Sequence, residues 1–219
     1  MAKKKEITHK DVLGFYIDYF LENNKQPHSV YKFAKHYNFE ESVFYANFSS
    51  FEQIEKTYFT SLFEQTISLL QKSEDFDSYD ARTKLLSFYF TYFEMLTANR
   101  SFTVALLKED KNKLKNLSKL SELRIHFKEF YNDLDIEKID LKQDKLVELQ
   151  EKSMSEMAWI QFLFTLKFWI DDTSLSFEKT DIFIEKSINT SFDLMDIAPL
   201  KSLIDFGKFM WKEKASFKM

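Results

Sequence analysis

The residues that most often carry out chemistry are sparse in this sequence. Cysteine is absent, and there are only four histidines. The nearest approach to a metal-binding pattern is Glu122, His126 and Glu129, which one helix would bring close together. Carboxylate-bridged metal centres need a second such group from another helix. No second copy accompanies this one, so a solvated charged face explains it better, and we expect no metal. The histidines are His9, His28, His36 and His126.

Patterns for phosphate binding and for nucleophilic catalysis are also missing. The two glycines, Gly14 and Gly207, stand alone, so there is no glycine-rich phosphate loop. No serine lies in the strand-to-helix context of a nucleophile elbow. We therefore expect a binding protein without a cofactor rather than an enzyme.

The composition favours helices. Two Gly and two Pro in 219 residues disfavour a turn-rich sheet fold and suit a nearly all-helical chain. The longest apolar stretch, 158–170, is interrupted by Gln161 and Lys167 and is too short for a membrane span. The first residues contain no apolar run of a secretory signal. We expect an all-α protein.

The stretch 29–54 says most about function. Apolar residues recur at one-face helical spacing in 30–37 and again in 44–48, which predicts two short helices. Asn38 lies between them, where a turn needs a residue that tolerates positive φ. Ser50 precedes Gln53 by three residues, the spacing of a capping box that opens a further helix. Two short helices around a tight turn are the plan of a helix-turn-helix.

This stretch resembles the DNA-binding signature of TetR-family transcriptional regulators, which reads roughly V-S-x-x-T-L-Y-x-H-F-x-S-K-E-x-L. The alignment needs no gap, and Ser29-Val30 and Phe33-Ala34 match the T-V and I-A pairs upstream. The resemblance implies a three-helix head, residues 1–50, on a larger helical ligand-binding and dimerisation domain, residues 51–219. The matching positions are Phe39, Phe44, Tyr45, Phe48, Ser50, Glu52 and Ile54.

The departures from the signature fall where the family contacts DNA. Glu40 replaces the serine that caps the recognition helix, and Glu41 follows it. Carboxylates suit a helix N-terminus, but they would repel an approaching phosphate. Val43 stands for the usual Thr, Asn38 for the usual Gly, and Phe51 for the basic residue after Ser50.

Residues 1–50 carry seven Lys and six acidic residues, so their net charge is +1. The net charge of the whole chain is −4, so the remaining residues carry −5. This asymmetry favours DNA contact at the N-terminal end. The contact candidates on the first short helix can reach the phosphate backbone, and those on the second can reach base edges. They are Lys32, Lys35, His36, Glu41, Ser42, Val43, Tyr45 and Asn47.

Hydrophobic periodicity predicts nine or ten helices. The first helix would bury Leu13, Ile17, Phe20 and Leu21, and an acidic connector at 73–79 would follow the helix that links the head to the body. The expected helices span 8–24, 29–36, 40–47, 51–72, 80–98, 102–116, 121–133, 144–171, 175–196 and 199–212, with a polar loop at 135–144.

The aromatic residues of the body have two interpretations. They can line a cavity for a small apolar ligand, as the resemblance implies, or they can fill an ordinary core. Gln161 and Lys167 would be polar handles in such a pocket or surface residues. The ligand candidates are Phe88, Tyr92, Phe127, Tyr131, Met157, Trp159, Gln161 and Phe162.

The resemblance also implies a homodimer that forms through the last two long helices. Trp169, Ile182, Phe183 and Ile188 would supply its apolar area, although burial within one chain explains the same residues. We therefore expect a cytoplasmic, homodimeric regulator that binds double-stranded DNA, is released by a small apolar ligand and has no membrane partner. The alternative is a protein of the same fold that binds lipids or small molecules and has lost specific DNA binding.

Overall fold

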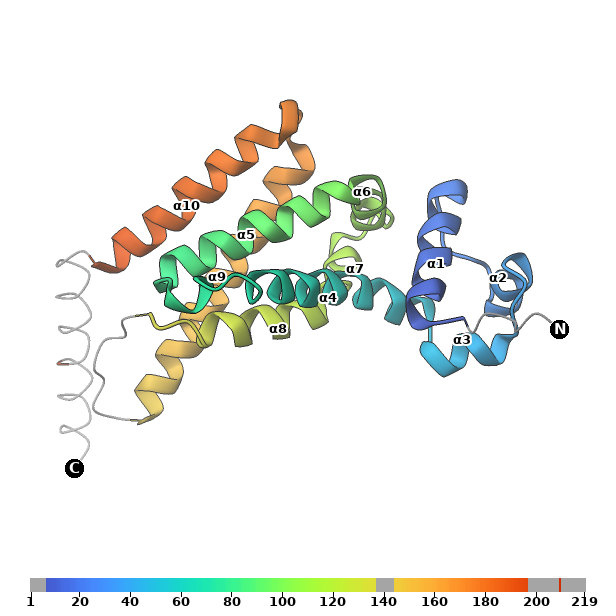
Figure 1. Ribbon diagram of the computed structural model, residues 1–219, viewed down its shortest axis with the longest axis horizontal. Helices are drawn as coiled ribbons and strands as arrows, with labels where there is room; N and C mark the ends of the chain where they lie inside the picture. Colours follow the sequence, from blue (N-terminus) through green and yellow to red (C-terminus); the bar gives the residue numbers. More distant parts are fainter. Residues whose placement is uncertain (1–6, 137–143, 197–208, 210–219) are drawn as a thin grey trace. The chain divides into compact units, whose positions relative to one another are not determined.

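The computed structural model describes residues 7–136, 144–196 and 209. These residues form ten α-helices and two short 3₁₀ turns, and no strand occurs among them (Figure 1). The all-α prediction is therefore confirmed. The helix expected at 199–212 lies outside the described residues apart from position 209, and most of the polar loop expected at 135–144 also lies outside them.

The helix bounds follow the sequence pattern closely at most positions. The helices are α1 (His9–Asn23), α2 (Val30–His36), α3 (Glu41–Asn47), α4 (Phe51–Leu70), α5 (Ala81–Ala98), α6 (Arg100–Lys108), α7 (Lys113–Ser118), α8 (Ser121–Asn132), α9 (Asp144–Asp171) and α10 (Glu178–Asp196), with 3₁₀ turns η1 (Phe76–Ser78) and η2 (Leu175–Phe177).

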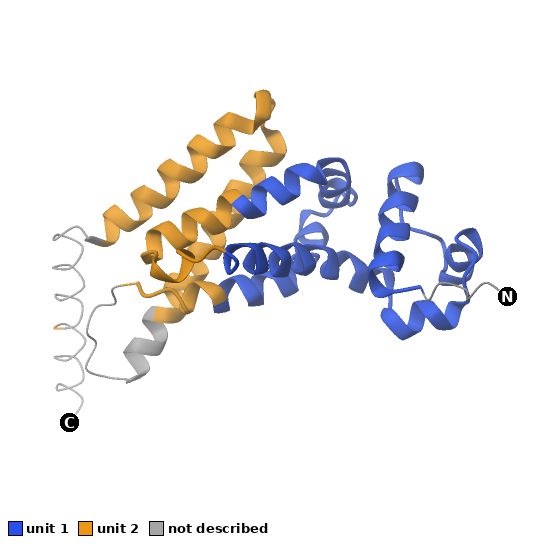
Figure 2. Ribbon diagram, viewed as in Figure 1, with its two compact units in different colours: residues 1–72, 91–129 blue, residues 73–90, 130–219 orange. Residues whose placement is uncertain are grey.

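The chain divides into two compact units (Figure 2). Unit 1 contains residues 1–72 and 91–129, and unit 2 contains residues 73–90 and 130–219. The head, the linking helix α4 and helices α6 and α7 thus share one unit. The boundary expected at residue 50 is a different division, and it stays a prediction.

Helix α1 begins and ends at strong local signals. The Thr8 hydroxyl accepts from the Asp11 backbone N–H, and the Asp11 carboxylate accepts from the Thr8 backbone N–H at 2.8 Å, which is a complete capping box. Asn24 ends the helix in the left-handed conformation, with φ of 53°.

The buried face of α1 differs from the expected one. Val12, Tyr16 and Phe20 are buried, whereas Leu21 is exposed. Leu13 and Ile17, which were expected inside, are only half-buried. The prediction was correct for Phe20 and wrong for Leu21. Helix α1 is apolar over more than one side, so periodicity alone leaves its rotation open.

The single helix expected at 102–116 is two helices. Asn112 interrupts it, because its side-chain oxygen accepts from the Leu114 N–H at 3.0 Å and so caps a new helix. The Asn116 side chain accepts from the Asp110 N–H and donates to the Asp110 carbonyl, at 3.1 and 2.8 Å. Asparagine and aspartate side chains here satisfy backbone groups that a continuous helix would have paired.

Unit 2 contains the α9–α10 hairpin, whose turn is held by Asp172. Its carboxylate accepts from the backbone N–H and hydroxyl of both Ser174 and Thr180, at 2.7–2.9 Å. Helix α10 therefore begins at 178 rather than 175. Burial by itself would raise the pKa of Asp172, but these four hydrogen bonds outweigh it and lower the pKa to about 2.

Candidate nucleic-acid interface

Helices α2 and α3 are two short helices joined by a tight turn (Figure 1). Asn38 occupies the turn with φ of 56°, in the left-handed region that the sequence predicted for it. The Phe39 N–H then donates to the Ala34 carbonyl at 2.9 Å, which closes the end of α2. Asparagine adopts this conformation more readily than most residues with a Cβ, so it replaces glycine here.

The core of the head is aromatic. The rings of Phe33 and Phe44 are fully buried and lie 6.1 Å apart in an edge-to-face arrangement. Phe48, from the end of α3, is buried as well. These rings fix α3 against α2, so the solvent-facing residues of both helices have defined positions.

The replacement of a basic residue by Phe51 has a structural explanation. Its ring centroid lies 5.2 Å from that of Phe44, 5.6 Å from that of Phe33 and 5.6 Å from that of Tyr16. Phe51 is half-buried, and its ring packs against the aromatic core of the head. A lysine or arginine at this position would lose these ring contacts.

The N-termini of α3 and α4 are capped differently. Glu40 is the N-cap of α3, and its side chain makes no capping hydrogen bond. The Ser50 hydroxyl accepts from the Gln53 N–H at 3.2 Å, as the capping-box spacing predicted. The Gln53 side chain reaches back one residue further than expected, accepting from the Ser49 N–H at 2.6 Å.

The α2 contact candidates are all exposed. Lys32 and Lys35 extend into solvent, while His36 packs its ring edge-on against Tyr19 and Tyr37, at 5.7 and 4.7 Å. The two lysines are free to reach a phosphate, whereas His36 is held in place by its ring contacts.

The α3 candidates separate into two groups. Glu41, Ser42 and Tyr45 are exposed, with Tyr45 at 58%. Val43 and Asn47 are half-buried, and the Asn47 side-chain amide donates to the Val43 carbonyl at 2.8 Å. That amide is already used within the helix, so Tyr45 and Ser42 are the better placed hydrogen-bonding groups.

Tyr31 is an exposed aromatic residue that was not among the candidates. It is 57% exposed, and the Lys35 ammonium lies 5.9 Å from its ring centroid. The two residues are one helical turn apart, and this i, i+4 spacing is the signal that points to the pair.

The ligand candidates lie in both units and are mostly buried. Tyr92 and Phe127 belong to unit 1, where the Tyr92 hydroxyl donates to the Phe59 carbonyl at 3.3 Å. In unit 2 the Trp159 ring stacks on Phe162 at 5.1 Å. Phe88 and Tyr131 are also buried in unit 2, whereas Met157 is 70% exposed.

The two polar residues within the apolar run have structural partners. The Gln161 side chain donates to the Ser187 hydroxyl at 3.3 Å and accepts from the Ser191 hydroxyl at 3.1 Å, so it ties α9 to α10. Lys167 pairs with Asp171 at 2.7 Å on the exposed surface. The surface interpretation of Lys167 therefore fits the structure.

The α9–α10 hairpin carries an exposed apolar stripe. Met157, Ile160, Phe164 and Phe168 recur along α9 at helical spacing, and Phe164 is 64% exposed. By contrast, two of the expected dimer residues, Trp169 and Ile188, have no exposed surface in the protomer and pack inside unit 2. The stripe faces away from that interior.

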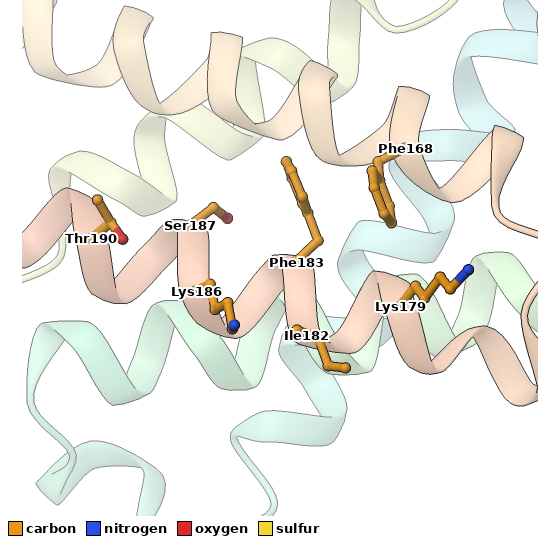
Figure 3. Close-up of a pocket in the computed structure, with 7 residues that line it drawn as sticks. All are labelled: Phe168, Lys179, Ile182, Phe183, Lys186, Ser187 and Thr190. Atoms are coloured by element: carbon orange, nitrogen blue, oxygen red, sulfur yellow. The ribbon is translucent and has the colours of Figure 1, made fainter.

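A shallow groove of about 570 Å³ runs beside this stripe (Figure 3). Phe168 and Phe183 lie between α9 and α10 with their rings stacked at 4.6 Å. Half-exposed Ile182 projects from α10 on the other side, between Lys179 and Lys186. Two of the expected dimer residues, Ile182 and Phe183, thus line a solvent-facing apolar groove.

The sequence did not point to a group of four polar side chains inside unit 1, which we name the charge cluster. It consists of Tyr16, Glu55, Glu109 and Lys119. The Tyr16 hydroxyl donates to Glu55 at 2.6 Å, and the Lys119 ammonium lies 3.3 Å from Glu55 and 2.5 Å from Glu109. Glutamate is rarely buried unless it is paired, which is why Glu55 was not expected inside.

Among the described residues, no group of three or more His, Asp or Glu side chains could hold a metal ion. His126 and Glu129 form only an exposed pair at 3.7 Å. Within the same described ranges, no helix has the length and apolar character needed to cross a membrane.

Comparison with known proteins agrees with this architecture. The family model described as "Tetracyclin repressor-like, C-terminal domain" matches residues 84–210, which is more than half of the chain. The chain therefore belongs to the tetracyclin-repressor-like, or TetR, family, a family of regulators. A search of curated proteins finds no match.

Proposed function

We propose that this protein is a transcriptional regulator that binds double-stranded DNA as a homodimer and is released by a small apolar ligand. The observation that carries the proposal is the α2–α3 arrangement, in which a left-handed Asn38 joins two short helices over an aromatic core. That arrangement belongs to a chain whose body matches the TetR family.

Within this proposal α3 enters the major groove and α2 crosses the backbone. Lys32 and Lys35 neutralise phosphates, and His36 adds a hydrogen-bond donor beside them. On α3, Ser42 and Tyr45 face the DNA, and Val43 offers an apolar contact for a thymine methyl group. Glu41 accepts from a cytosine amino group, which gives an acidic residue a favourable place in the groove.

The homodimer forms through the exposed faces of α9 and α10. A stripe of large apolar residues is costly to leave in water, and burial stabilises by about 25 cal/mol per Å² of apolar area. Met157, Ile160, Phe164 and Phe168 on α9 join Ile182 and Phe183 on α10 in this interface. Trp169 and Ile188 support the interface from within the protomer.

The ligand binds among the aromatic side chains of the body. In unit 2, Trp159 stacks on Phe162, and the Tyr89 ring meets Phe162 at 5.8 Å. An apolar ligand that replaces these ring contacts would favour a different packing of α5 against α9. A ligand shifts the equilibrium only by its difference in affinity for the two arrangements.

An electrophoretic mobility shift with fragments of the source genome at low salt tests the DNA-binding half. We expect a discrete shifted band that is lost with Lys35→Ala and retained with Lys72→Ala, an exposed lysine after α4 used as a control. A protein that shifts no fragment, or one that responds equally to both variants, would contradict the proposal.

The acidic N-terminus of α3 favours a second candidate, a small-molecule-binding protein of the same fold without specific DNA binding. Glu40 and Glu41 are both exposed there, and Glu40 makes no capping hydrogen bond. If Glu41→Lys creates DNA binding in a protein that otherwise has almost none, the second candidate is favoured.

A further inference from the structure

The charge cluster joins the first helix of the head to the segment that follows α6. Tyr16 lies on α1 and Glu55 on α4, while Glu109 directly follows α6 and Lys119 lies between α7 and α8. Helix α1, helix α4 and the segment 109–119 thus meet in unit 1 through one set of polar contacts. Helix α1 itself packs against α3, the proposed recognition helix.

The cluster holds two carboxylates and a single ammonium group. The Glu55 side chain is only 5% exposed, and the Lys119 ammonium also donates to the Leu106 carbonyl at 3.1 Å. A buried carboxylate that loses its partner is strongly unfavourable. The cluster therefore has one well-satisfied arrangement, which requires Lys119 to stay in place.

The protonation of Glu55 depends on Lys119. Burial raises the pKa of the Glu55 carboxyl, whereas the Tyr16 hydroxyl and the Lys119 ammonium oppose that rise and Glu109 adds to it. If Lys119 were withdrawn, burial and the Glu109 charge would still raise the pKa of Glu55, and only the Tyr16 hydroxyl would oppose that rise. Glu55 would then take up a proton or become exposed to water, and its hydrogen bond with Tyr16 would change.

Lys119 is placed to respond to movement elsewhere in unit 1. It is the first of the two residues between α7 and α8, and α8 carries Phe127, one of the ligand candidates. A rotation or shift of α8 would carry the backbone of Lys119 with it. The apolar contacts of α1 with Phe102, at 6.3 Å from Tyr16 and 5.5 Å from Phe20, do not depend on this charge.

We propose that Lys119 is a positioning residue, which holds α1 of the head against the segment after α6 and releases it when the α7–α8 junction moves. The coupling within unit 1 stands on the contacts of the charge cluster. Its effect on DNA affinity rests on the function proposed above.

Hydrogen exchange of the DNA-free protein tests the coupling directly. The variants are Lys119→Met, Glu55→Gln and the double variant, with Lys115→Met as the matched control. Lys115 lies in the same segment but pairs with Asp110 on the surface, at 3.3 Å. We expect Lys119→Met to speed exchange of the α1 amides by roughly tenfold or more, with α10 unchanged.

The double variant distinguishes coupling from a general loss of stability. When Glu55 is already neutral, adding Lys119→Met should change α1 exchange by no more than about twofold, because the buried charge it would expose is gone. If Lys119→Met does not fold, Lys119→Gln takes its place, because it removes the charge and keeps a donor for the Leu106 carbonyl. Hydrogen exchange of Lys119→Gln is then compared with and without Glu55→Gln.

The proposal would be overturned if Lys119→Met sped α1 exchange equally in the wild-type and Glu55→Gln proteins. Uniform loss of protection across α1 and α10 would overturn it as well. So would an effect of Lys115→Met as large as that of Lys119→Met. A mobility shift on the same variants separates the two claims: if wild-type protein binds no DNA but the exchange cycle behaves as expected, the proposed function fails and the coupling stands.

Discussion

At the scale of single residues, Glu41 is the side chain whose charge most affects the proposed interface. It is exposed in the first turn of α3, where the helix dipole favours a carboxylate but a DNA phosphate does not. The stability of α3 and its affinity for DNA thus make opposite demands on this position. Glu41 is compatible with both the stability of α3 and DNA binding only if it accepts a hydrogen bond from a base and does not face the DNA phosphates.

We predict that Glu41→Lys raises non-specific DNA affinity by about tenfold and makes the salt dependence steeper by about one unit of slope, because it adds one phosphate contact. Fluorescence anisotropy with random duplexes at several salt concentrations measures both quantities. Glu64→Lys, an exposed exchange of the same charge on α4, is the control and should leave them unchanged. A response to Glu64→Lys as large as that to Glu41→Lys would show a general charge effect.

Asp172 makes stability depend on acid. Its pKa is about 2 in the folded protein, below its ordinary value of 3.8. The carboxylate therefore contributes stability that is fully present above about pH 4 and is lost as the pH falls through 2. We predict that Asp172→Asn destabilises by about 1–2 kcal/mol at pH 7 and removes this part of the acid dependence.

Urea unfolding of wild type and Asp172→Asn between pH 2 and pH 7 measures this effect. Asp171→Asn, the neighbouring exposed residue that pairs with Lys167, serves as the control and should cost much less. Parallel stability profiles of wild type and Asp172→Asn over the whole pH range would refute the assignment.

At the scale of secondary-structure elements, the turn between α2 and α3 depends on a single left-handed residue. Asn38 has φ of 56°, a conformation that strains residues with a Cβ and that asparagine tolerates better than alanine does. We predict that Asn38→Ala destabilises the protein by about 1 kcal/mol. Asn38→Gly should be tolerated, since glycine takes this conformation without steric cost.

Thermal unfolding followed by circular dichroism compares the two variants. Asn116→Ala is unsuitable as a control because that side chain bonds Asp110, so exposed Asn132→Ala is preferred. A stability of Asn38→Ala equal to that of Asn38→Gly would mean that the turn tolerates any residue.

The elements that the sequence predicted well are those with local signals. The bounds of α2 and α3, the left-handed Asn38 and the cap at Ser50 all follow from residues within one turn of each other. The split between α6 and α7 was missed although its signals are also local, since Asn112 caps Leu114 two residues later and Asn116 bonds Asp110 six residues earlier.

The rotation of helices about their own axes was the harder problem. Helix α9 is apolar on all sides over 158–170, so its pattern does not say which residues turn inward. In the structure Trp159, Phe162 and Trp169 are buried, while Phe164 and Phe168 are turned towards solvent. Buried Glu55 was missed for the opposite reason, since its partners Tyr16 and Lys119 are 39 and 64 positions away in sequence.

At the scale of the whole molecule, the proposed homodimer would form through the exposed stripe of α9. We predict that Phe164→Glu abolishes the homodimer, because a charge would then have to be buried at the interface. Sedimentation equilibrium measures the change. Leu117→Glu, which changes an exposed residue of α7 in unit 1, should leave the dimer intact. A Phe164→Glu protein that remains dimeric would place the interface elsewhere.

Family membership and the geometry of the head together predict how a dimer would bind DNA. A homodimer with two helix-turn-helix heads reads two half-sites related by two-fold symmetry, with centres about one helical turn or a multiple of it apart. In the proposal made above, the charge cluster inside unit 1 sets how firmly each head is held. The proposed regulator would thus combine a dimer interface, a ligand-responsive interior and two DNA-reading heads.

Footprinting of the wild-type dimer on a fragment selected from genomic DNA tests this account most directly. The account predicts two protected segments of inverted-repeat sequence, about one or two helical turns apart, which both disappear with Phe164→Glu. Protection of a single half-site that survives Phe164→Glu, or no protection even at low salt, would contradict it.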